Sequence, residues 1–363
     1  MAEQDLLQQP LVSITVSVRD GEQWVDGCLA SLVAQDWPNV EIIVVDDGSS
    51  DASTAKLLVW DDPEGMNNNH PVSVLTQGAK GLSAARSSAL VKAGGEWVAI
   101  TDIDVRPEPS WISHLMSARF PLDESETVVA VTGRTVFDSG EGIISKLRAS
   151  EVAEKYRNRP RTTSLANGPC SIFERRALLE VGGFDESWYH AEDMEVSLRL
   201  IGSGGTIVYS PDAVVNHVAE DNIATFLAKR TRDARAHVRI VRHHPKRGRT
   251  LGFDFIGSAW WILMLCPVIL MAISGIVIGF DNLYLESNSF DLSSNMQILA
   301  LICIIPLLIH LLYFPQTVIG SLLILRQPIW SLKIIAVLYM WSWSLWKGLA
   351  LGYLDAILGR NGH

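Results

Sequence analysis

The sequence predicts an α/β fold, a doubly wound and mainly parallel sheet, followed by C-terminal transmembrane helices. Over the first hundred residues, short runs of β-branched and aliphatic residues alternate with helically spaced apolar residues, which is the pattern of βαβ units. Acidic residues close two of the predicted strands. From Phe253 onward the chain becomes strongly apolar, and six of its 12 tryptophans lie in that part.

Strands and helices are expected in a regular order. Residues 22–34, for example, space Val25, Leu29 and Leu32 as one face of a helix. Up to residue 101 we expect strands at 11–18, 40–45, 72–75 and 97–101, separated by helices at 22–34, 51–60 and 82–92. Further along we expect strands at 128–132, 206–209 and 213–216, and helices at 142–157, 192–201 and 226–242. Residues 167–190 are rich in Gly, Pro and aromatic residues, which suits a binding surface more than a core.

Composition and charge narrow the possible functions. The chain has 363 residues, of which 48% are hydrophobic, and a formal net charge of −10. This acidic balance argues against a protein that binds nucleic acid. The first residues, MAEQDLLQQP, lack the basic and apolar regions of a signal peptide. Neither disulfide nor metal spacing is evident among the cysteines, so we expect them to be reduced and structural: Cys28, Cys170, Cys266 and Cys303.

One basic stretch breaks the acidic balance. Nine Lys and Arg lie between Lys229 and Arg249, against the single acid Asp233. Helical spacing places several of these arginines beside an apolar stripe, and a basic amphipathic helix of this kind commonly lies on an anionic membrane surface. We therefore expect an interfacial helix over residues 221–250. The alternative is a charged face that packs on the α/β domain.

Two long apolar segments follow the basic stretch. Residues 255–280 and 298–325 contain no Asp, Glu, Lys or Arg, and about 20 apolar residues cross a bilayer. A third segment, at about 330–356, is interrupted by Lys347 and either spans the membrane or lies in its interface. The positive-inside rule then places residues 1–250 in the cytosol. We expect a multi-pass cell-membrane protein with an α/β domain at 1–220, the interfacial helix at 221–250 and a membrane domain at 251–363.

The most informative motif is the Asp-x-Asp of Asp102 and Asp104. It closes the apolar run at 97–101, and ligands of open α/β sheets bind beyond the carboxyl ends of the strands. Two carboxylates one residue apart can share a divalent cation, and a phosphorylated ligand can fill the remaining positions. Because Asp also favours turns, the alternative is a solvated turn.

Two further motifs lie at the same predicted edge. Asp46 and Asp47 end the second strand, where a carboxylate can accept hydrogen bonds from a base or ribose. Gly81 opens the helix at 82–92 and permits close backbone approach, and Arg86 on that helix is suited to a phosphate or a base. An arginine on a helix is more often simply solvated.

Together these motifs resemble glycosyltransferase family 2, whose members are inverting nucleotide-sugar enzymes with the GT-A fold. The resemblance covers roughly residues 10–240 and is carried by the segments LVSITVSVRDGEQWVDGCLASLVAQDWPNVEIIVVDDGSSDAS, GLSAARSSAL, TDIDVRP and NGPCSIFERRALLEVGGFDESWYHAEDMEVSLRL. The chain departs from the family at Arg19-Asp20, where Tyr-Asn is commoner. The resemblance therefore leaves the nucleotide open.

The resemblance also implies roles for the donor side of the site. Asp46 would contact the nucleobase, with Asp47 and Arg86 nearby. Asp102 would face the nucleotide, and Asp104 would ligate Mg²⁺ or Mn²⁺ beneath the diphosphate.

On the acceptor side, the resemblance matches Asp193 to the catalytic base. Glu192 is its rival, and only one of two adjacent helical residues can face the acceptor. Trp188 either stacks on an acceptor sugar or packs at the rim. His217 falls where some GT-A enzymes supply a further metal or phosphate contact, and a structural histidine is the alternative.

We therefore expect a membrane-anchored, metal-dependent, inverting glycosyltransferase. It would transfer a sugar from a nucleotide-sugar donor to a hydroxyl of a lipid-linked saccharide or glycan. One alternative is transfer to a polyprenyl phosphate, which is already ionised and needs no base. An alternative of another class is a catalytically inactive, membrane-anchored scaffold that binds nucleotide sugars.

Overall fold

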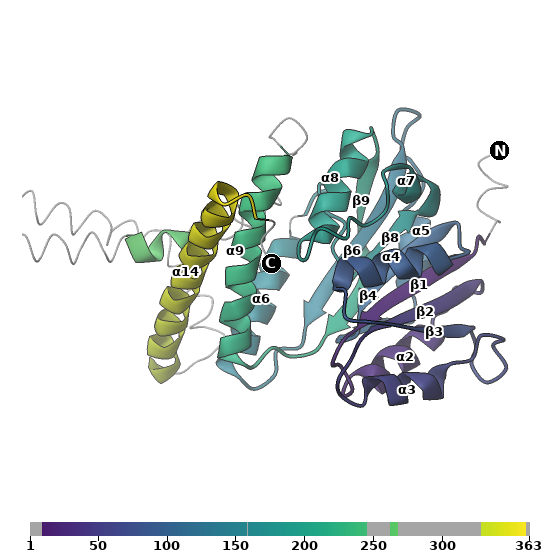
Figure 1. Cartoon of the computed structure of the whole chain (residues 1–363), viewed down its shortest axis with the longest axis horizontal. Helices are drawn as coiled ribbons and strands as arrows, with labels where there is room; N and C mark the ends of the chain where they lie inside the picture. Colours follow the sequence, from purple (N-terminus) through teal and green to yellow (C-terminus); the bar gives the residue numbers. More distant parts are fainter. Residues whose placement is uncertain (1–8, 158, 245–261, 268–327, 361–363) are drawn as a thin grey trace, which may run out of the picture. The chain divides into compact units, whose positions relative to one another are not determined.

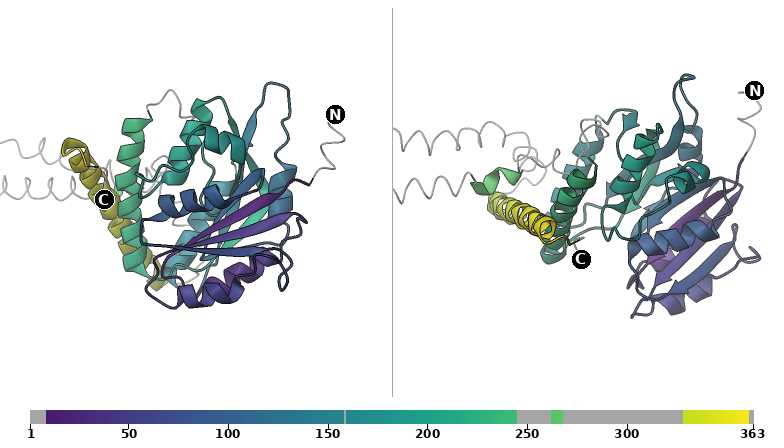
Figure 2. Two further views of the ribbon diagram at one scale, coloured as in Figure 1. Left: turned by 45° about the vertical axis from the view of Figure 1, so that its right-hand side comes forward. Right: turned by 45° about the horizontal axis from the view of Figure 1, so that its top comes forward.

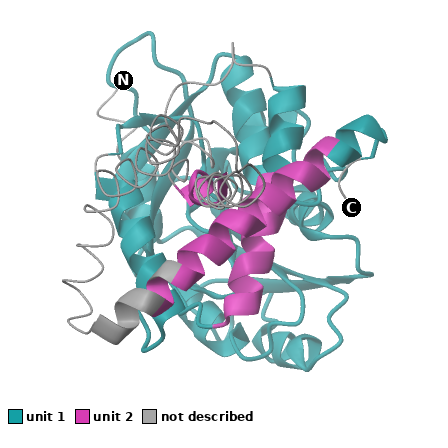
Figure 3. Cartoon of the chain, turned by 90° about the vertical axis from the view of Figure 1, so that its left-hand side faces the viewer, with its two compact units in different colours: residues 1–221, 236–253, 354–363 teal, residues 222–235, 254–353 magenta. Residues whose placement is uncertain are grey.

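The computed structural model describes residues 9–157, 159–244, 262–267 and 328–360. The chain divides into two compact units (Figure 3). One comprises residues 1–221, 236–253 and 354–363, and the other comprises residues 222–235 and 254–353.

In the first unit the described residues form one nine-stranded sheet (Figure 1). Its strands run in the order β3-β2-β1-β4-β8-β6-β9-β5, and β7 pairs with β9. The strand bounds are β1 Val12–Val18, β2 Val40–Asp47, β3 Val72–Gln77, β4 Trp97–Asp102, β5 Val105–Pro107, β6 Val128–Phe137, β7 Thr162–Thr163, β8 Ser171–Glu174 and β9 Thr206–His217. The helix bounds are α2 Val25–Val33, α3 Ser53–Trp60, α4 Leu82–Lys92, α5 Trp111–Ser117, α6 Ile143–Arg157, α7 Arg175–Glu180, α8 Glu192–Gly202, α9 Ile223–His243 and α14 Pro328–Ile357.

The prediction of an α/β sheet is confirmed, but the sheet is mixed rather than mainly parallel. β3, β2, β1 and β4 are parallel neighbours, as the βαβ pattern predicts. β8 then runs antiparallel to both β4 and β6, and β5 and β7 run antiparallel to β9. Strand direction depends on the path of the connections, which the hydrophobic pattern of a single strand does not encode.

The sheet is buried on both faces, because alternate residues of its central strands enter different cores. Ile42 and Val44 pack in the core beneath α2, α3 and α5, whereas Ile43 and Val45 pack in the core beneath α4, α7 and α8. This gives a helix–sheet–helix sandwich (Figure 2). Strands buried on both faces read as continuous apolar runs, which is why the sequence predicts them well.

Several elements are missing from the sequence prediction or differ from it. The short strands β5, β7 and β8 and the short helices α5 and α7 were not expected. The two strands expected at 206–209 and 213–216 form one strand, β9, although Pro211 lies between them. A register shift opposite Thr132 and Arg134 of β6 lets the pairing resume beyond Pro211, as in a β-bulge.

The helix expected at 226–242 is confirmed as α9, but two of its arginines pack on protein. In the first unit, Arg239 covers the ring of Trp188, with its guanidinium carbon 4.0 Å from the ring centroid. In the second unit, Arg230 is buried and pairs with Asp233 at 3.2 Å. These contacts agree with the alternative of a packed charged face, while Arg232 and Arg242 stay exposed.

The predicted membrane spans at 255–280 and 298–325 lie outside the described residues, apart from 262–267. The third segment, at about 330–356, is helical and corresponds to α14. Within the described ranges, no helix combines the length and the apolar character that a membrane crossing requires.

Candidate functional site

The predicted site residues at the ends of β2 and β4 meet at one edge of the sheet. β1 lies between these two strands and is parallel to both. Its register places Val18 beside Asp46 and Ser17 beside Asp102. The two carboxylates therefore flank the end of β1, where ligands of open α/β sheets bind.

Asp46 and Asp47 are both buried, and their side chains hold the surrounding loops. Asp46 accepts hydrogen bonds from the backbone N–H of Ser49 at 3.0 Å and from the Thr54 hydroxyl. Asp47 accepts from the backbone N–H groups of Lys80 and Gly81 at 2.8 and 2.7 Å. This fixes the turn that precedes α4.

Gly81 and Asp20 each adopt a left-handed backbone conformation at this edge. Gly81 has φ 99°, and a Cβ there would meet only Tyr189, at 3.8 Å. Gly81 is therefore required for its backbone conformation rather than for space. Asp20 has φ 51° and accepts a hydrogen bond from the backbone N–H of Ser50 at 2.7 Å. Asn and Asp both tolerate this conformation, which accounts for Asp20 where the family more often has Asn.

Arg86 joins the strand that carries the Asp-x-Asp motif to the helix that carries the predicted base. It lies on α4, is 4% exposed, and pairs with Asp102 at 3.1 Å and with Glu192. Glu192, the first residue of α8, is itself 4% exposed. Both ends of the guanidinium thus contact carboxylates of the protein. Arg86 therefore lies beside the donor-side residue Asp102, and its role toward a nucleotide stays a prediction.

The charges of this network shift one another's pKa values. Burial raises the pKa of Glu192, although the charge of Arg86 opposes the rise. The pKa of Asp102 is likewise raised by burial, with Arg86 opposing and Asp104 adding to the rise. Burial would lower the pKa of Arg86, but the charges of Glu192, Asp102 and Asp193 outweigh it and raise that pKa. The arginine therefore stays charged.

Asp104 and His217 face each other across the end of the sheet. His217 Nε2 lies 3.3 Å from Asp104 Oδ2. His217 Nδ1 lies 2.8 Å from the carbonyl oxygen of Val218, and its ring stacks on Phe137 with the centroids 4.2 Å apart. Because a carbonyl oxygen can only accept a hydrogen bond, Nδ1 carries the ring proton. In the neutral ring, Nε2 then directs its lone pair at the Asp104 carboxylate. A metal ion between the two atoms would bind to both of them.

This pair fits a divalent metal ion whose remaining ligands come from elsewhere. A backbone carbonyl on the second ring nitrogen is the common way to orient a metal-binding histidine. Across the described part of the chain, no group of three or more His, Cys, Asp or Glu could hold a metal ion. Asp104 and His217 would therefore need phosphate oxygens and water to complete the coordination, as Mg²⁺ sites with phosphorylated substrates do.

Asp193, the second residue of α8, lies beside this network. Its Oδ2 accepts a hydrogen bond from the backbone N–H of Gly168 at 2.9 Å, and its Oδ1 accepts one from Met194 N–H at 2.7 Å. Ala191, the residue just before α8, has φ 61°, a left-handed conformation that costs roughly 1–2 kcal/mol for a residue with a Cβ. Strain of this kind gathers at functional sites. It turns the chain so that Glu192 enters the core while Asp193 stays partly exposed.

Two residues expected on the acceptor side lie elsewhere. Trp188 is 3% exposed and packs against Leu198 and Ile240, under Arg239. Its ring is part of the packing between α8 and α9, not an open stacking surface. Glu192 is held by Arg86 in the interior. Neither placement was readable from sequence, because both depend on which face of α8 is covered.

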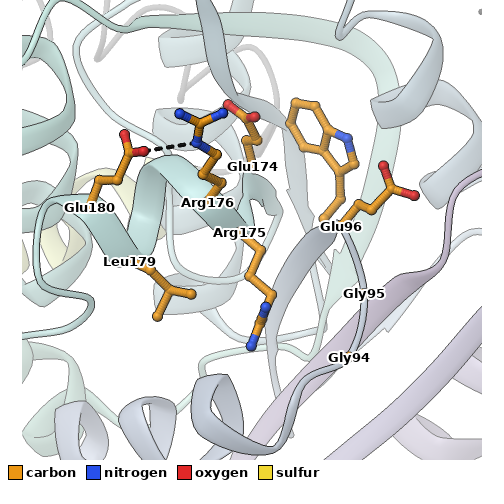
Figure 4. A pocket seen from close by; sticks show the side chains of 9 residues that line it. Gly94, Gly95, Glu96, Glu174, Arg175, Arg176, Leu179 and Glu180 are labelled. Atoms are coloured by element: carbon orange, nitrogen blue, oxygen red, sulfur yellow. Dashed lines mark hydrogen bonds and ion pairs between the residues drawn. The ribbon is translucent and has the colours of Figure 1, made fainter.

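A hollow at the opposite edge of the sheet contains none of the predicted site residues (Figure 4). This open pocket has a volume of about 520 Å³. It lies where β4 begins and β8 ends, and its lining includes Trp97, Glu174 and Arg175. In an α/β sheet this edge is remote from the ligand-binding crevice.

Comparisons with known proteins agree with the fold and with the motifs. Residues 13–182 match the family model "Glycosyl transferase family 2". The pre-mycofactocin glycosyltransferase of Mycobacterium tuberculosis is 26% identical over 260 residues, which are 70% of this chain and 52% of that protein. The putative glycosyltransferase EpsH of Bacillus subtilis is 32% identical over 155 residues, 43% of this chain and 42% of that protein. The chain thus spans about half the length of these curated relatives.

A third relative and a solved structure cover more of the chain. The poly-beta-1,6-N-acetyl-D-glucosamine synthase of Staphylococcus epidermidis is 24% identical over 299 residues, 78% of this chain and 70% of that protein. The mannosyltransferase PcManGT from Pyrobaculum calidifontis has a TM-score of 0.59 at 19% identity and covers 96% of this chain and 88% of that one. At this identity the likeness concerns the fold, which is a GT-A-like mixed α/β fold. Residues 13–182, a little under half of the chain, are thus similar to glycosyltransferase family 2.

Proposed function

We propose that this protein is a metal-assisted, inverting glycosyltransferase that uses a nucleotide-sugar donor and a hydroxyl acceptor. One observation carries the proposal. Asp102, Asp104 and Asp193 gather at one edge of a glycosyltransferase family 2 domain, where Arg86 links the strand of the first to the helix of the third. The mannosyltransferase of similar fold was solved with GDP-Man and Mn²⁺, the ligand classes proposed here.

The residues divide the chemistry between the two ends of the site. Asp193 takes the proton of the acceptor hydroxyl as the hydroxyl oxygen attacks the anomeric carbon, and the nucleoside diphosphate leaves from the opposite side. Asp104 and His217 would hold the metal ion, which stabilises the negative charge of the leaving diphosphate. An imidazole nitrogen is a softer ligand than oxygen, which favours Mn²⁺ over Mg²⁺ at this pair. By pairing with Asp102 and Glu192, Arg86 holds the strand and the helix that carry these two ends of the site in a fixed position relative to each other.

We also propose that the acceptor is a lipid-linked saccharide or glycan and that the enzyme acts at the cytosolic face of the cell membrane. The support is the basic stretch of α9 followed by the apolar segments, together with the positive-inside rule. A membrane anchor would hold the site close to such an acceptor.

Donor binding and transfer can be tested in one series. A panel of nucleotide sugars is titrated into the full chain with Mn²⁺, and the donor that binds is used in single-turnover transfer. Asp193→Asn should leave donor affinity nearly unchanged and slow transfer by about 10²–10⁴-fold, since it removes the base. That loss corresponds to a barrier increase of roughly 3–5 kcal/mol. Asp212→Asn, an exposed change on β9, is the matched control.

The same series separates the alternatives. Asp104→Ala should abolish the metal-dependent part of donor affinity, and unchanged affinity would refute the metal assignment. A small effect of Asp193→Asn on transfer would point to a polyprenyl phosphate acceptor, which has no proton to lose. Donor binding without any transfer or hydrolysis would favour the inactive scaffold.

A further inference from the structure

A stripe of cationic side chains follows one face of α6 and the residues just after it. Arg148 and Lys155 are seven residues apart on α6, which keeps them on one face of that helix, and Arg159 follows after the helix ends at Arg157. Arg148 lies 4.8 Å from the ring centroid of Phe137, and Phe137 stacks on His217. This end of the stripe therefore adjoins the proposed metal pair.

The other end of the stripe adjoins the candidate base. The Tyr156 hydroxyl lies 3.2 Å from the side-chain nitrogen of Asn167, and the next residue, Gly168, donates its backbone N–H to Asp193. Lys155 precedes Tyr156, and its charge interacts with that of Asp193. Seven helical residues rise about 10 Å, so Lys155 lies well along the site from Arg148.

Lys155 differs from its two neighbours in its charge balance. Arg148 pairs with Glu151, and Arg159 donates to the Thr163 hydroxyl at 2.9 Å and to the Leu165 carbonyl at 2.7 Å. Within the part of the chain that the structure describes, no carboxylate pairs with the Lys155 ammonium. Burial, with the nearby charge of Arg159, lowers the pKa of Lys155 to about 8.

The groups around Lys155 leave it in a positive environment. Arg148 and Arg159 add positive charge, whereas Glu151 on α6 and Asp193 on α8 are the opposing carboxylates. A partly buried ammonium with no ion pair lowers stability, and an anion bound beside it removes that penalty. The donor diphosphate belongs at the Asp104–His217 end, so the anion at Lys155 must come from another molecule.

We propose that Lys155 forms an anion subsite on the acceptor side of Asp193, so that the acceptor carries a phosphate or carboxylate group near its attacking hydroxyl. This inference rests on the proposed function for the role of Asp193. The ion pair would hold the acceptor so that its hydroxyl faces Asp193. A lipid-linked saccharide would supply a phosphate, and an acidic glycan would supply a carboxylate.

The test measures anion binding when the donor site is already filled. The full chain is saturated with the nucleoside diphosphate and Mn²⁺, and inorganic phosphate or acetate is then titrated while thermal stability is recorded. Lys155→Met should weaken anion binding by at least about tenfold and leave nucleotide affinity unchanged. Lys146→Met is the matched control, because nine residues along a helix place Lys146 on the opposite face.

A pH series adds a readout that a purely structural role would not move. Wild-type anion binding should weaken about tenfold between pH 7 and pH 9, as Lys155 loses its proton. Lys155→Arg should keep its binding over this range, because arginine stays charged. A stronger response to phosphate than to acetate would indicate a phosphorylated acceptor, and the reverse an acidic glycan.

Two results would overturn the inference: equal anion binding by the wild type and Lys155→Met, or no anion binding by the wild type once nucleotide is bound. Failure of the nucleotide and metal to bind in the first step would instead refute the proposed function. The two failures therefore appear at different steps of one titration.

Discussion

At the scale of single residues, Arg86 determines how the acidic residues of the site divide their roles. Its guanidinium pairs with Asp102 and Glu192 in the interior. Asp193, one residue further along α8, instead accepts a hydrogen bond from Gly168 and stays partly exposed. One of two adjacent acids is thus paired in the interior, and the other is partly exposed.

The structural role of Glu192 can be tested by stability. Glu192→Gln removes one carboxylate from a buried ion pair and should lower the free energy of unfolding by about 3 kcal/mol. Denaturant unfolding of the full chain, followed by tryptophan fluorescence, measures the change. Glu154→Gln breaks an exposed pair with Arg157 on α6 and should change stability little. Equal effects of the two substitutions would contradict the assigned role of Glu192.

Lys155 gives a pH-dependent prediction for stability. Its pKa is lowered from 10.5 to about 8 in the folded protein, so the unfolded chain binds the proton more tightly. The charged Lys155 therefore lowers the free energy of unfolding. This loss of stability is complete below pH 8 and disappears as the pH rises to 10.5. At about 1.4 kcal/mol per pKa unit it amounts to at most about 3 kcal/mol.

Lys155→Met should therefore stabilise the free protein by about 1–3 kcal/mol at pH 7. The difference from the wild type should shrink steadily between pH 8 and pH 10.5, and unfolding at a series of pH values measures it. A constant difference would show that the substitution acts through packing alone.

At the scale of elements, the exposed side chains of α14 concern the third apolar segment, for which the sequence predicts either a membrane span or a helix in the membrane interface. Large apolar side chains are exposed along this helix at helical spacing, including Met340, Trp343, Tyr353 and Ile357. Trp343 is 63% exposed, and tryptophan favours the interface between membrane and water. With its lysines this composition suits a helix that lies in the interface.

An environment-sensitive fluorophore on cysteine can test this placement. Cys28 and Cys170 are buried, and burial raises the pKa of each to about 12, so they should not react with the fluorophore. Cys266 and Cys303 are first replaced by serine. A label at Trp343→Cys should shift to the blue when anionic vesicles are added. The same label at Val59→Cys, an exposed site on α3, should not. Matching spectra at the two positions would rule out an interfacial α14.

Elements were predictable in proportion to their length and burial. The strands at 40–45 and 97–101 are nearly continuous apolar runs because both their faces are covered, and the strand at 11–18 is rich in β-branched residues. β1, β2 and β4 match these three predictions closely. The two-residue strand β7 and the three-residue strand β5 are too short to show any period. They exist because β9 offers them a pairing edge, which is a property of the assembled sheet.

At the scale of the whole molecule, the residue pattern was enough to predict the α/β class, the parallel strands β1 to β4 and the place of Asp102 at the end of a strand, whereas Asp193 was named only through the resemblance to a family. The residue pattern could do so because strand ends and acidic motifs are local features, and parallel strands bring their carboxyl ends to one edge. Three features became visible only in the folded chain: β8 runs antiparallel to its neighbours, Arg86 pairs with Glu192, and Trp188 is buried. Each of these depends on which distant segment covers a given face, and residue order does not encode such contacts locally.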